Sequence, residues 1–311
     1  MATKLMFRNH LHLILLGFFI VMTGCAGQKM LHPKTAAHHD LKKVILVLRT
    51  LNYSGLEETV AKQIRSQLLE AIQKGGQILV QEDTAFSATP SQPPKVILPE
   101  FGLWSDAELL KKAEEEGLSI LLLPILNPFE IHEIRTGIWP LIKSKQELEL
   151  SMTLNAFDPV HHMVYLIHLE SQKITLPKFD QGFAFGDPVN NEQKWKSIPE
   201  AAWQKHWSHI IARQVAVFLK ETAKRSWTGQ IVSTESEIVL INAGLNIGLR
   251  DGLVCEVFEK VESLGPNNWK VFLEGPKVGE IQITKTMDQT ALAVPLDKAE
   301  IKPGQLIRVK N

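Results

Sequence analysis

Two groups of histidines in this sequence could bind a metal ion. His206 and His209 stand three residues apart in a segment with helical periodicity, a spacing that can hold a metal ion. No glutamate or third histidine at an adjacent turn completes a ligand set, so we interpret them as a packed or exposed pair. His38, His39 and Asp40 are consecutive, and adjacent residues on a polar tail chelate a metal poorly. We therefore predict no metal site and no cofactor.

The two cysteines have different surroundings. Cys255 lies in an apolar stretch over residues 253–258, without a nearby histidine or asparagine to activate a thiol, so we expect a small buried hydrophobic residue. Cys25 ends a run of small residues, where it has no packing reason to be. If Cys25 is modified, the chain can form no internal disulfide, and two cysteines are too few for a thiolate zinc site.

Catalytic motifs are missing from the sequence. It contains no nucleophile elbow, phosphate loop, dinucleotide fingerprint, metalloprotease helix or kinase signature. Gly244, Gly248 and Gly252 are spaced by four, but a strand follows them, so we interpret them as turn residues with positive φ. With Asn242 they form our candidate interaction loop, and the acidic run at residues 114–116 is expected to be solvated. We predict no catalytic residue and no enzyme activity; a hydrolase whose groups converge from distant positions is the alternative.

The first 24 residues have the layout of a secretory signal. Lys4 and Arg8 form a basic start, and an apolar run over residues 13–22 leads into the small residues Thr23 and Gly24. The run is short for crossing a hydrocarbon core, which needs about 20 apolar residues in a helix. We therefore predict a cleaved signal and not a permanent anchor helix.

The end of the signal, Val21-Met22-Thr23-Gly24-Cys25, resembles the bacterial lipobox, with Met22 where leucine is more usual. This resemblance implies cleavage before Cys25 and acylation of that residue with diacylglycerol and palmitate, which would anchor the chain stably. Ala26, and not aspartate, follows Cys25, and the familiar sorting rule then implies the periplasmic face of the outer membrane. An inner-membrane location and a plain secreted protein stay open as alternatives.

The length and net charge of the chain limit the number of domains and the kinds of partner that it can have. A chain of 311 residues allows one large domain or two smaller ones. Lysine and arginine balance aspartate and glutamate at 34 each, which leaves no basic footprint for DNA or RNA. We therefore predict no nucleic-acid partner.

Hydrophobic periodicity divides the mature chain into a tether (25–42), an α/β domain (43–227) and a small all-β domain (228–311). In the α/β domain we predict strands at 44–48, 78–80 and 120–126, and helices at 56–72, 105–116 and 198–227. Ser105 and Glu108 form the capping box of the second helix, and a Pro-rich excursion covers 87–99. Alternating segments at 129–135, 147–157 and 164–174 predict three neighbouring antiparallel strands.

The last part of the chain contains short apolar segments separated by Gly, Pro, Asn and Asp. We predict strands at 229–232, 237–242, 253–261, 270–273, 279–283, 291–294 and 305–309. Short, evenly spaced strands without intervening helices indicate a small barrel or sandwich. The fold class is therefore an α/β (α+β) domain with a mixed sheet and flanking helices, followed by a small barrel-like domain.

The C-terminal segment also resembles a known family. The segments Val239-Leu240-Ile241-Asn242-Ala243-Gly244, Gly248-Leu249-Arg250-Asp251-Gly252, Gly279-Glu280-Ile281 and Ile301-Lys302-Pro303-Gly304-Gln305 resemble the C-terminal domain of the flagellar assembly protein T family. Residues 43–225 are similar in pattern to that family's middle domain, and also to the N-terminal domain of TolB and the curli-secretion lipoproteins. The resemblance implies a periplasmic protein that helps to form a ring around the flagellar basal body through protein contacts. The sequence departs from the family by lacking its separate N-terminal domain and by carrying the lipobox.

These observations together predict a non-enzymatic, periplasm-facing lipoprotein that acts as a scaffold or assembly factor of an envelope structure such as the flagellar basal body. The partners they imply are a membrane, through Cys25, envelope or flagellar basal-body proteins, and further copies of the chain. The alternative is a lipoprotein activator or secretion factor that contacts peptidoglycan synthases or a secretion channel, with residues 87–99 as its contact arm.

Overall fold

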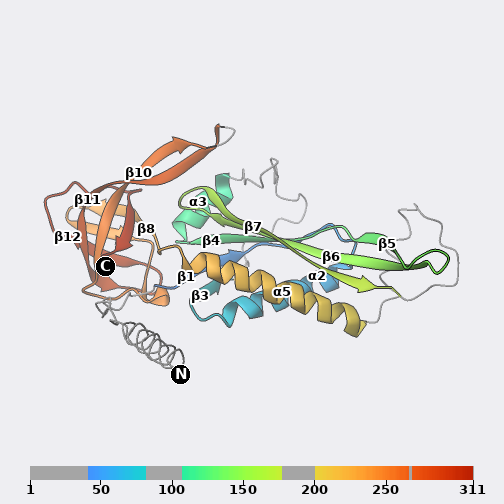
Figure 1. The fold of residues 1–311 in the computed structure, drawn as a ribbon. Helices are drawn as coiled ribbons and strands as arrows, with labels where there is room; N and C mark the ends of the chain where they lie inside the picture. The colour runs from blue at the N-terminus through green and yellow to red at the C-terminus, as the bar shows by residue number, and fades with distance from the viewer. Residues whose placement is uncertain (1–40, 82–106, 177–199, 266–267, 311) are drawn as a thin grey trace, which may run out of the picture. The chain divides into compact units, whose positions relative to one another are not determined.

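A computed structural model describes residues 41–81, 107–176, 200–265 and 268–310 (Figure 1). The predicted signal peptide, Cys25, the His38–Asp40 run and the Pro-rich excursion lie outside the described residues, as does the Ser105 cap. The predicted tether ends sooner than expected, because Leu41 is already buried and the Lys42 amide donates to the Ile247 carbonyl oxygen at 2.8 Å.

The first part of the fold is a mixed seven-stranded sheet, which confirms the predicted class. Its main path runs β3-β1-β4-β6-β5, while β2 pairs with β4 and β7 pairs with β6. The strands are β1 (Lys43–Val47), β2 (Leu51–Asn52), β3 (Ile78–Gln81), β4 (Ile120–Leu126), β5 (Glu130–Thr136), β6 (Lys143–Asp158) and β7 (Met163–Thr175). β1 pairs in parallel with β3 and β4, and β2 pairs in parallel with β4. β5, β6 and β7 are the three predicted antiparallel strands, and β6 also pairs antiparallel with β4.

Helices α2 (Glu58–Gln73) and α5 (Glu200–Ala223) cover one face of this sheet. In the helix predicted at 56–72, the apolar residues Ile64, Leu68 and Ile72 form a buried stripe on α2, since residues four apart share one face of a helix. α5 contributes a broader face that includes Trp207 and Phe218. In the described ranges, no helix has both the length and the apolar character needed to cross a bilayer.

The second part is a closed six-stranded barrel with the strand order β10-β11-β12-β9-β8-β13. Its strands are β8 (Gly229–Glu235), β9 (Ile238–Ile241), β10 (Val254–Leu264), β11 (Lys270–Thr286), β12 (Ala291–Pro295) and β13 (Leu306–Val309). The sequence predicts seven strands, but the segments at 270–273 and 279–283 are one strand, β11. The β10–β11 register shifts around Pro276, and a bulge of this kind accommodates a residue that has no N–H to donate.

The glycines of the loop after β9 serve two purposes. Gly248 and Gly252 have φ values of 96° and 85°, as the sequence predicts. The prediction is wrong for Gly244, whose φ of −146° is open to any residue. A Cβ at Gly244 would lie 2.4 Å from the carbonyl oxygens of Met287 and Asp288, so this glycine is required by a close approach of two backbone segments.

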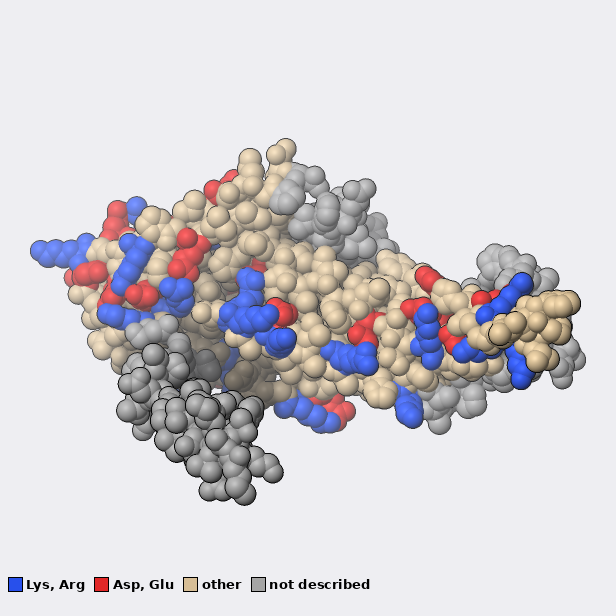
Figure 2. All heavy atoms as spheres, in the orientation of Figure 1, with Lys and Arg blue, Asp and Glu red and all other residues tan. Residues whose placement is uncertain are grey.

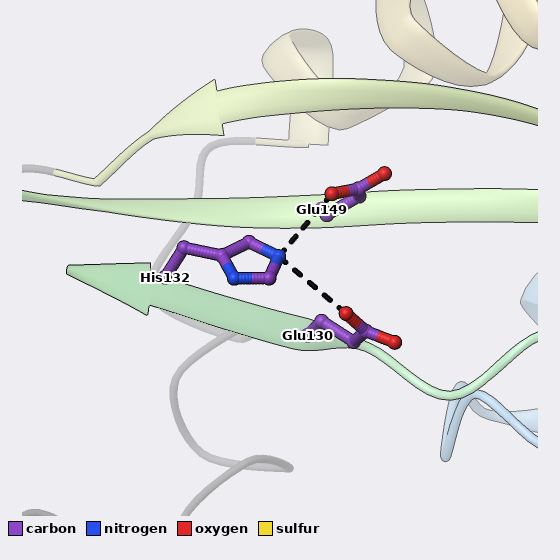
Figure 3. A group of neighbouring side chains, drawn as sticks. All are labelled: Glu130, His132 and Glu149. Atoms are coloured by element: carbon purple, nitrogen blue, oxygen red, sulfur yellow. Dashed lines mark ion pairs between the residues drawn. The ribbon is translucent and has the colours of Figure 1, made fainter. Parts of the chain in front are cut away.

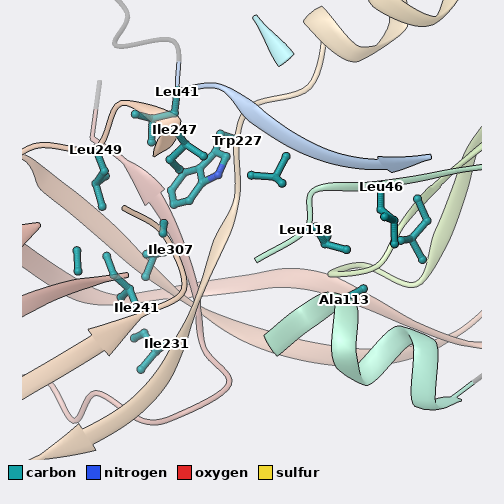
Figure 4. Close-up of a cluster of buried hydrophobic side chains, with 14 of the residues drawn as sticks. Leu41, Leu46, Ala113, Leu118, Trp227, Ile231, Ile241, Ile247, Leu249 and Ile307 are labelled. Carbon is teal, nitrogen blue, oxygen red and sulfur yellow. The ribbon is translucent and has the colours of Figure 1, made fainter. Parts of the chain in front are cut away.

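A continuous buried cluster runs from the sheet into the barrel. It joins Leu46 of β1 and Ala113 of helix α3 (Ala107–Glu115) to Ile231 and Ile241 of the barrel. Figure 4 draws part of this cluster, in which Leu41, Ile247 and Trp227 lie near one another. The α/β part and the barrel therefore share a hydrophobic core.

Candidate functional site

Charged side chains from three elements meet where the barrel joins the α/β part. Glu114, in the last turn of α3, places its Oε1 atom 2.9 Å from His162 Nε2 and 3.1 Å from Lys260 Nζ. Its backbone carbonyl accepts a hydrogen bond of 2.7 Å from Asn242 Nδ2. The expectation of a solvated acidic run is therefore wrong for Glu114, because the barrel packs against this end of the helix; Glu115 keeps an exposed side chain.

The environment of Glu114 favours its charged form. Burial alone would raise the pKa of this carboxyl, but the hydrogen bond to His162 and the charge of Lys260 outweigh burial and hold the pKa below its usual value. Lys260 Nζ also lies 4.3 Å from the centre of the Phe272 ring, which packs edge-on against His162. We call Glu114, His162 and Lys260 the joint cluster.

Hydrogen bonds to two backbone carbonyl groups reinforce this junction. The Phe272 amide donates to the His161 carbonyl oxygen at 3.0 Å, and Trp269 Nε1 donates to the His162 carbonyl oxygen at 2.9 Å. The turn between β6 and β7 is thereby bonded to the hairpin of β10 and β11. The polar groups gathered here connect the two parts of the fold.

A second charged group, Asp158, His161 and Arg225, lines a cavity of about 260 Å³. Asp158 Oδ2 lies 2.9 Å from both His161 Nδ1 and Arg225 Nη2, and its Oδ1 atom accepts the amide hydrogens of Val160 and His161. Burial opposes the charge of Asp158, yet the hydrogen bond and charge of His161, together with Arg225, keep the pKa of Asp158 low.

The Asp158–His161 pair has the geometry of the orienting half of a hydrolase triad. Ser119, Ser226 and Thr228 also line the cavity, so hydroxyl groups are close by. In the described part of the chain, however, His161 makes no hydrogen bond to a hydroxyl group. Arg225 neutralises the carboxylate that would stabilise an imidazolium, and the group therefore has the chemistry of an internal ion-pair network.

The structure separates the members of the predicted interaction loop. Asn242 and Gly244 are buried, and the amide of Asn242 bridges the Gln230 N–H and the Glu114 carbonyl oxygen at 2.8 and 2.7 Å. Gly248 and Gly252 lie on the surface of the barrel. Asn242 thus makes an internal contact, and binding of a partner by the surface half of the loop stays a prediction.

The histidines of α5 are not brought to a further ligand among the described residues. His206 is partly buried, and burial, followed by the charge of Lys205, lowers its pKa; its Nδ1 atom has no hydrogen-bond partner in the described residues. His209 is exposed. One histidine of the pair is therefore partly buried and the other exposed, and the absence of a metal here stays a prediction.

The structure brings together one possible metal-ligand group that sequence reasoning missed, Glu130, His132 and Glu149 (Figure 3). His132 Nε2 lies 3.5 Å from Glu130 Oε2 and 3.2 Å from Glu149 Oε2. Two carboxylates and an imidazole suit a divalent ion, although Lys173 Nζ, 3.6 Å from Glu149 Oε2, competes as a cation. A hydrogen bond from Ser171, with Lys173 and His132, lowers the pKa of Glu149.

The signal for this group is weak in sequence. Glu130 and His132 are two apart on a strand and so share a face, which the alternation of β5 indicates. Glu149 joins them only through the register that sets Glu130 opposite Glu149 across the hairpin. Without the hairpin register, the three residues have no recognisable spacing.

Comparisons with known proteins find similar solved structures only. No family model and no curated protein matches the chain. The hypothetical protein CT253 from Chlamydia trachomatis is 15% identical, with 56% of this chain and 96% of that chain covered and a TM-score of 0.31. The PelC dodecamer from Paraburkholderia phytofirmans is 14% identical, with 58% of this chain and 88% of that chain covered and a TM-score of 0.30. The lipoprotein GNA1162 from Neisseria meningitidis is 11% identical, with 59% of this chain and 99% of that chain covered and a TM-score of 0.29. At these low scores the function has to be argued from the chain's own residues.

Proposed function

We propose that this chain is a lipid-anchored protein of the bacterial envelope that acts as a non-enzymatic scaffold or assembly factor. The observation that carries the proposal is the segment of residues 21–25, where a signal-like apolar run ends in small residues and Cys25. Acyl chains on Cys25 hold the mature chain at the periplasmic face of the outer membrane.

The arrangement of the charged groups supports a role through contacts. The buried or half-buried carboxylates of Glu114 and Asp158 are both paired with cations and histidines of the same chain. In these positions they join the turn after β6 and the end of α3 to their neighbours. A fold that is stabilised by such internal ion pairs presents fixed surfaces to a partner.

Within this proposal, the envelope structure is the flagellar basal body. The support is the resemblance of residues 239–305 to the C-terminal domain of flagellar assembly protein T, together with a six-stranded barrel in that region. Deletion of the coding sequence is expected to abolish motility, and the intact chain to restore it. Normal motility of the deletion strain would remove the flagellar assignment and leave the lipoprotein assignment in place.

The anchor is tested by the intact mass of the protein extracted from membranes. The wild-type chain is expected to begin at Cys25 and to carry the extra mass of acyl chains, whereas Cys25→Ser lacks that mass. Cys255→Ser is the matched control, because it removes the other cysteine and should leave the acyl mass unchanged. A wild-type product that is cut elsewhere and unmodified at Cys25 would contradict the proposal.

A further inference from the structure

The turn between β5 and β6 carries a group of large apolar side chains in solvent. Ile138, Trp139, Leu141 and Ile142 are 84%, 81%, 76% and 51% exposed. We call residues 138–142 the apolar tip. Exposed apolar side chains are ordinary when scattered singly, but a contiguous group of this kind marks a surface that contacts a protein or a membrane.

Basic residues flank the apolar tip on both strands. Arg135 precedes it by three residues, and Lys143 and Lys145 follow it; all three are exposed. We call Arg135, Lys143 and Lys145 the basic collar. Figure 2 shows this end of the hairpin as a tan surface with blue lysine and arginine side chains beside it.

The register of the hairpin distributes the collar over both of its faces. Lys143 lies opposite Thr136 and Lys145 opposite Ile134, which places the two lysines on one face, while Arg135 belongs to the other face. Arg135 pairs with Glu133 at 3.4 Å and Lys145 with Glu147 at 2.6 Å, but Lys143 has no acidic partner in the described ranges. The collar therefore leaves the charge of Lys143 for an outside anion, while Arg135 and Lys145 are exposed and paired with acids of their own strands.

We propose that the apolar tip enters the interface of an anionic phospholipid bilayer, with the basic collar at the level of the lipid phosphates. Tryptophan favours the headgroup region, and lysine and arginine beside an apolar segment are attracted to anionic lipid. A strand rises by about 3.3 Å per residue, so the collar lies within about 10 Å of the tip, comparable to the roughly 5–10 Å by which interfacial apolar groups enter a bilayer.

A protein partner fits the same surface less well. Stable protein interfaces involve roughly 20–30 residues on each side, and the four apolar side chains at the end of a narrow hairpin supply only a small part of that area. A bilayer accepts a small protruding apolar group without shape complementarity. This contact does not depend on acylation of Cys25, and it gives the chain a second point of attachment.

The test uses the chain from residue 25 with Cys25→Ser, so that no acyl chain is present. Its binding is measured by flotation with vesicles of phosphatidylglycerol and phosphatidylethanolamine, and with vesicles of phosphatidylcholine alone. The chain is expected to float with the anionic vesicles. The variant Ile138→Ser, Trp139→Ser, Leu141→Ser is expected to lose at least tenfold in binding.

Two further variants make the test specific. Ile167→Ser with Leu169→Ser is the matched control, because these side chains are 54% and 60% exposed on β7, away from the tip, and it should bind like the parent. The collar variant Arg135→Gln, Lys143→Gln, Lys145→Gln should lose the preference for anionic vesicles. Thermal unfolding of each variant establishes that it folds.

A spectroscopic measurement covers the case in which the tip variant does not fold. Lipids brominated near the headgroup should quench the fluorescence of the parent more strongly than that of Trp139→Phe. Equal quenching, equal flotation of parent and tip variant, or absence of binding by the parent would overturn the proposal. A second result would also overturn it: the parent sediments as a dimer and does not bind vesicles, whereas the tip variant sediments as a monomer. The tip would then bind a second copy of the chain.

Discussion

At the scale of single residues, the side-chain amide of Asn242 holds a barrel strand and the end of helix α3 at the same time. Its oxygen accepts the Gln230 N–H, its nitrogen donates to the Glu114 carbonyl oxygen, and the side chain is buried. Removing a partner from buried polar groups costs about 1–3 kcal/mol. We predict that Asn242→Ala lowers the free energy of unfolding by this amount in urea titration.

Asn246 provides the control for Asn242→Ala. Among the described residues, its side chain accepts a hydrogen bond only from the amide of the next residue, Ile247, and it is half-buried. Asn246→Ala should therefore change the free energy of unfolding much less. Equal losses for the two variants would show that Asn242 does not bridge the two parts.

The Asp158 carboxyl should make stability depend on acid. Its pKa is lower in the folded chain than its ordinary value of about 3.9, because His161 and Arg225 outweigh the effect of burial. A lowered folded pKa contributes stability that is complete above the unfolded pKa and is lost as the pH falls through the folded pKa. The difference in unfolding free energy between wild type and Asp158→Asn should therefore be largest near neutral pH and shrink below pH of about 4. A difference that stays constant down to pH of about 2 would contradict this assignment.

The Cys255 thiol should be inert in the folded barrel. Its side chain is buried, and burial raises its pKa to about 12, so the reactive thiolate is scarce at neutral pH. In the Cys25→Ser chain, a thiol reagent is expected to label no site before unfolding and one site in denaturant. Rapid labelling of the native protein would show that the barrel opens readily at β10.

At the scale of elements, two glycines that end helices separate backbone strain from packing. Gly76 and Gly117 have φ values of 72° and 67°, a region that costs other residues about 1–2 kcal/mol. A Cβ at Gly76 would meet nothing within 4 Å, whereas one at Gly117 would lie 2.2 Å from the Asn242 carbonyl oxygen. We predict that Gly76→Ala lowers the free energy of unfolding only by the cost of its positive φ. Gly117→Ala should lower that free energy clearly more, as measured by urea unfolding. Similar losses would mean that the barrel does not pack against the end of α3.

The helices and strands could be predicted well from periodicity, but the way in which strands continue and pair could be predicted less well. The stripe on α2 and the alternation of β5, β6 and β7 are local patterns, and the structure confirms them. The continuity of β11 could not be predicted, because Gly275 and Pro276 are ordinary turn signals and only the bulge in the β10–β11 ladder lets the strand continue. The Glu130–His132–Glu149 group could not be predicted from the sequence for a similar reason, since only the register of the β5–β6 hairpin brings its members together.

At the scale of the whole molecule, the site was harder to predict than the fold. The sequence suggested the Asn242–Gly252 loop as a contact surface, but the long-range contact to Glu114, which no local pattern encodes, buries Asn242. The apolar tip was missed because residues 138–142 occupy a short gap between two strands, where exposure depends on how far the hairpin protrudes. The prediction for Cys25 rests on a local motif that needs no fold, and it stays a prediction because Cys25 lies outside the described residues.

The central claim is that acylation at Cys25 places this chain in the outer membrane. The most direct test separates inner and outer membranes of cells on a sucrose gradient and compares wild type with Cys25→Ser. Our account predicts that the wild-type chain sediments with the outer membrane and that the variant leaves that fraction, while Cys255→Ser stays with the wild type. Identical distributions of wild type and Cys25→Ser, or a wild-type chain free in the periplasm, would contradict the account.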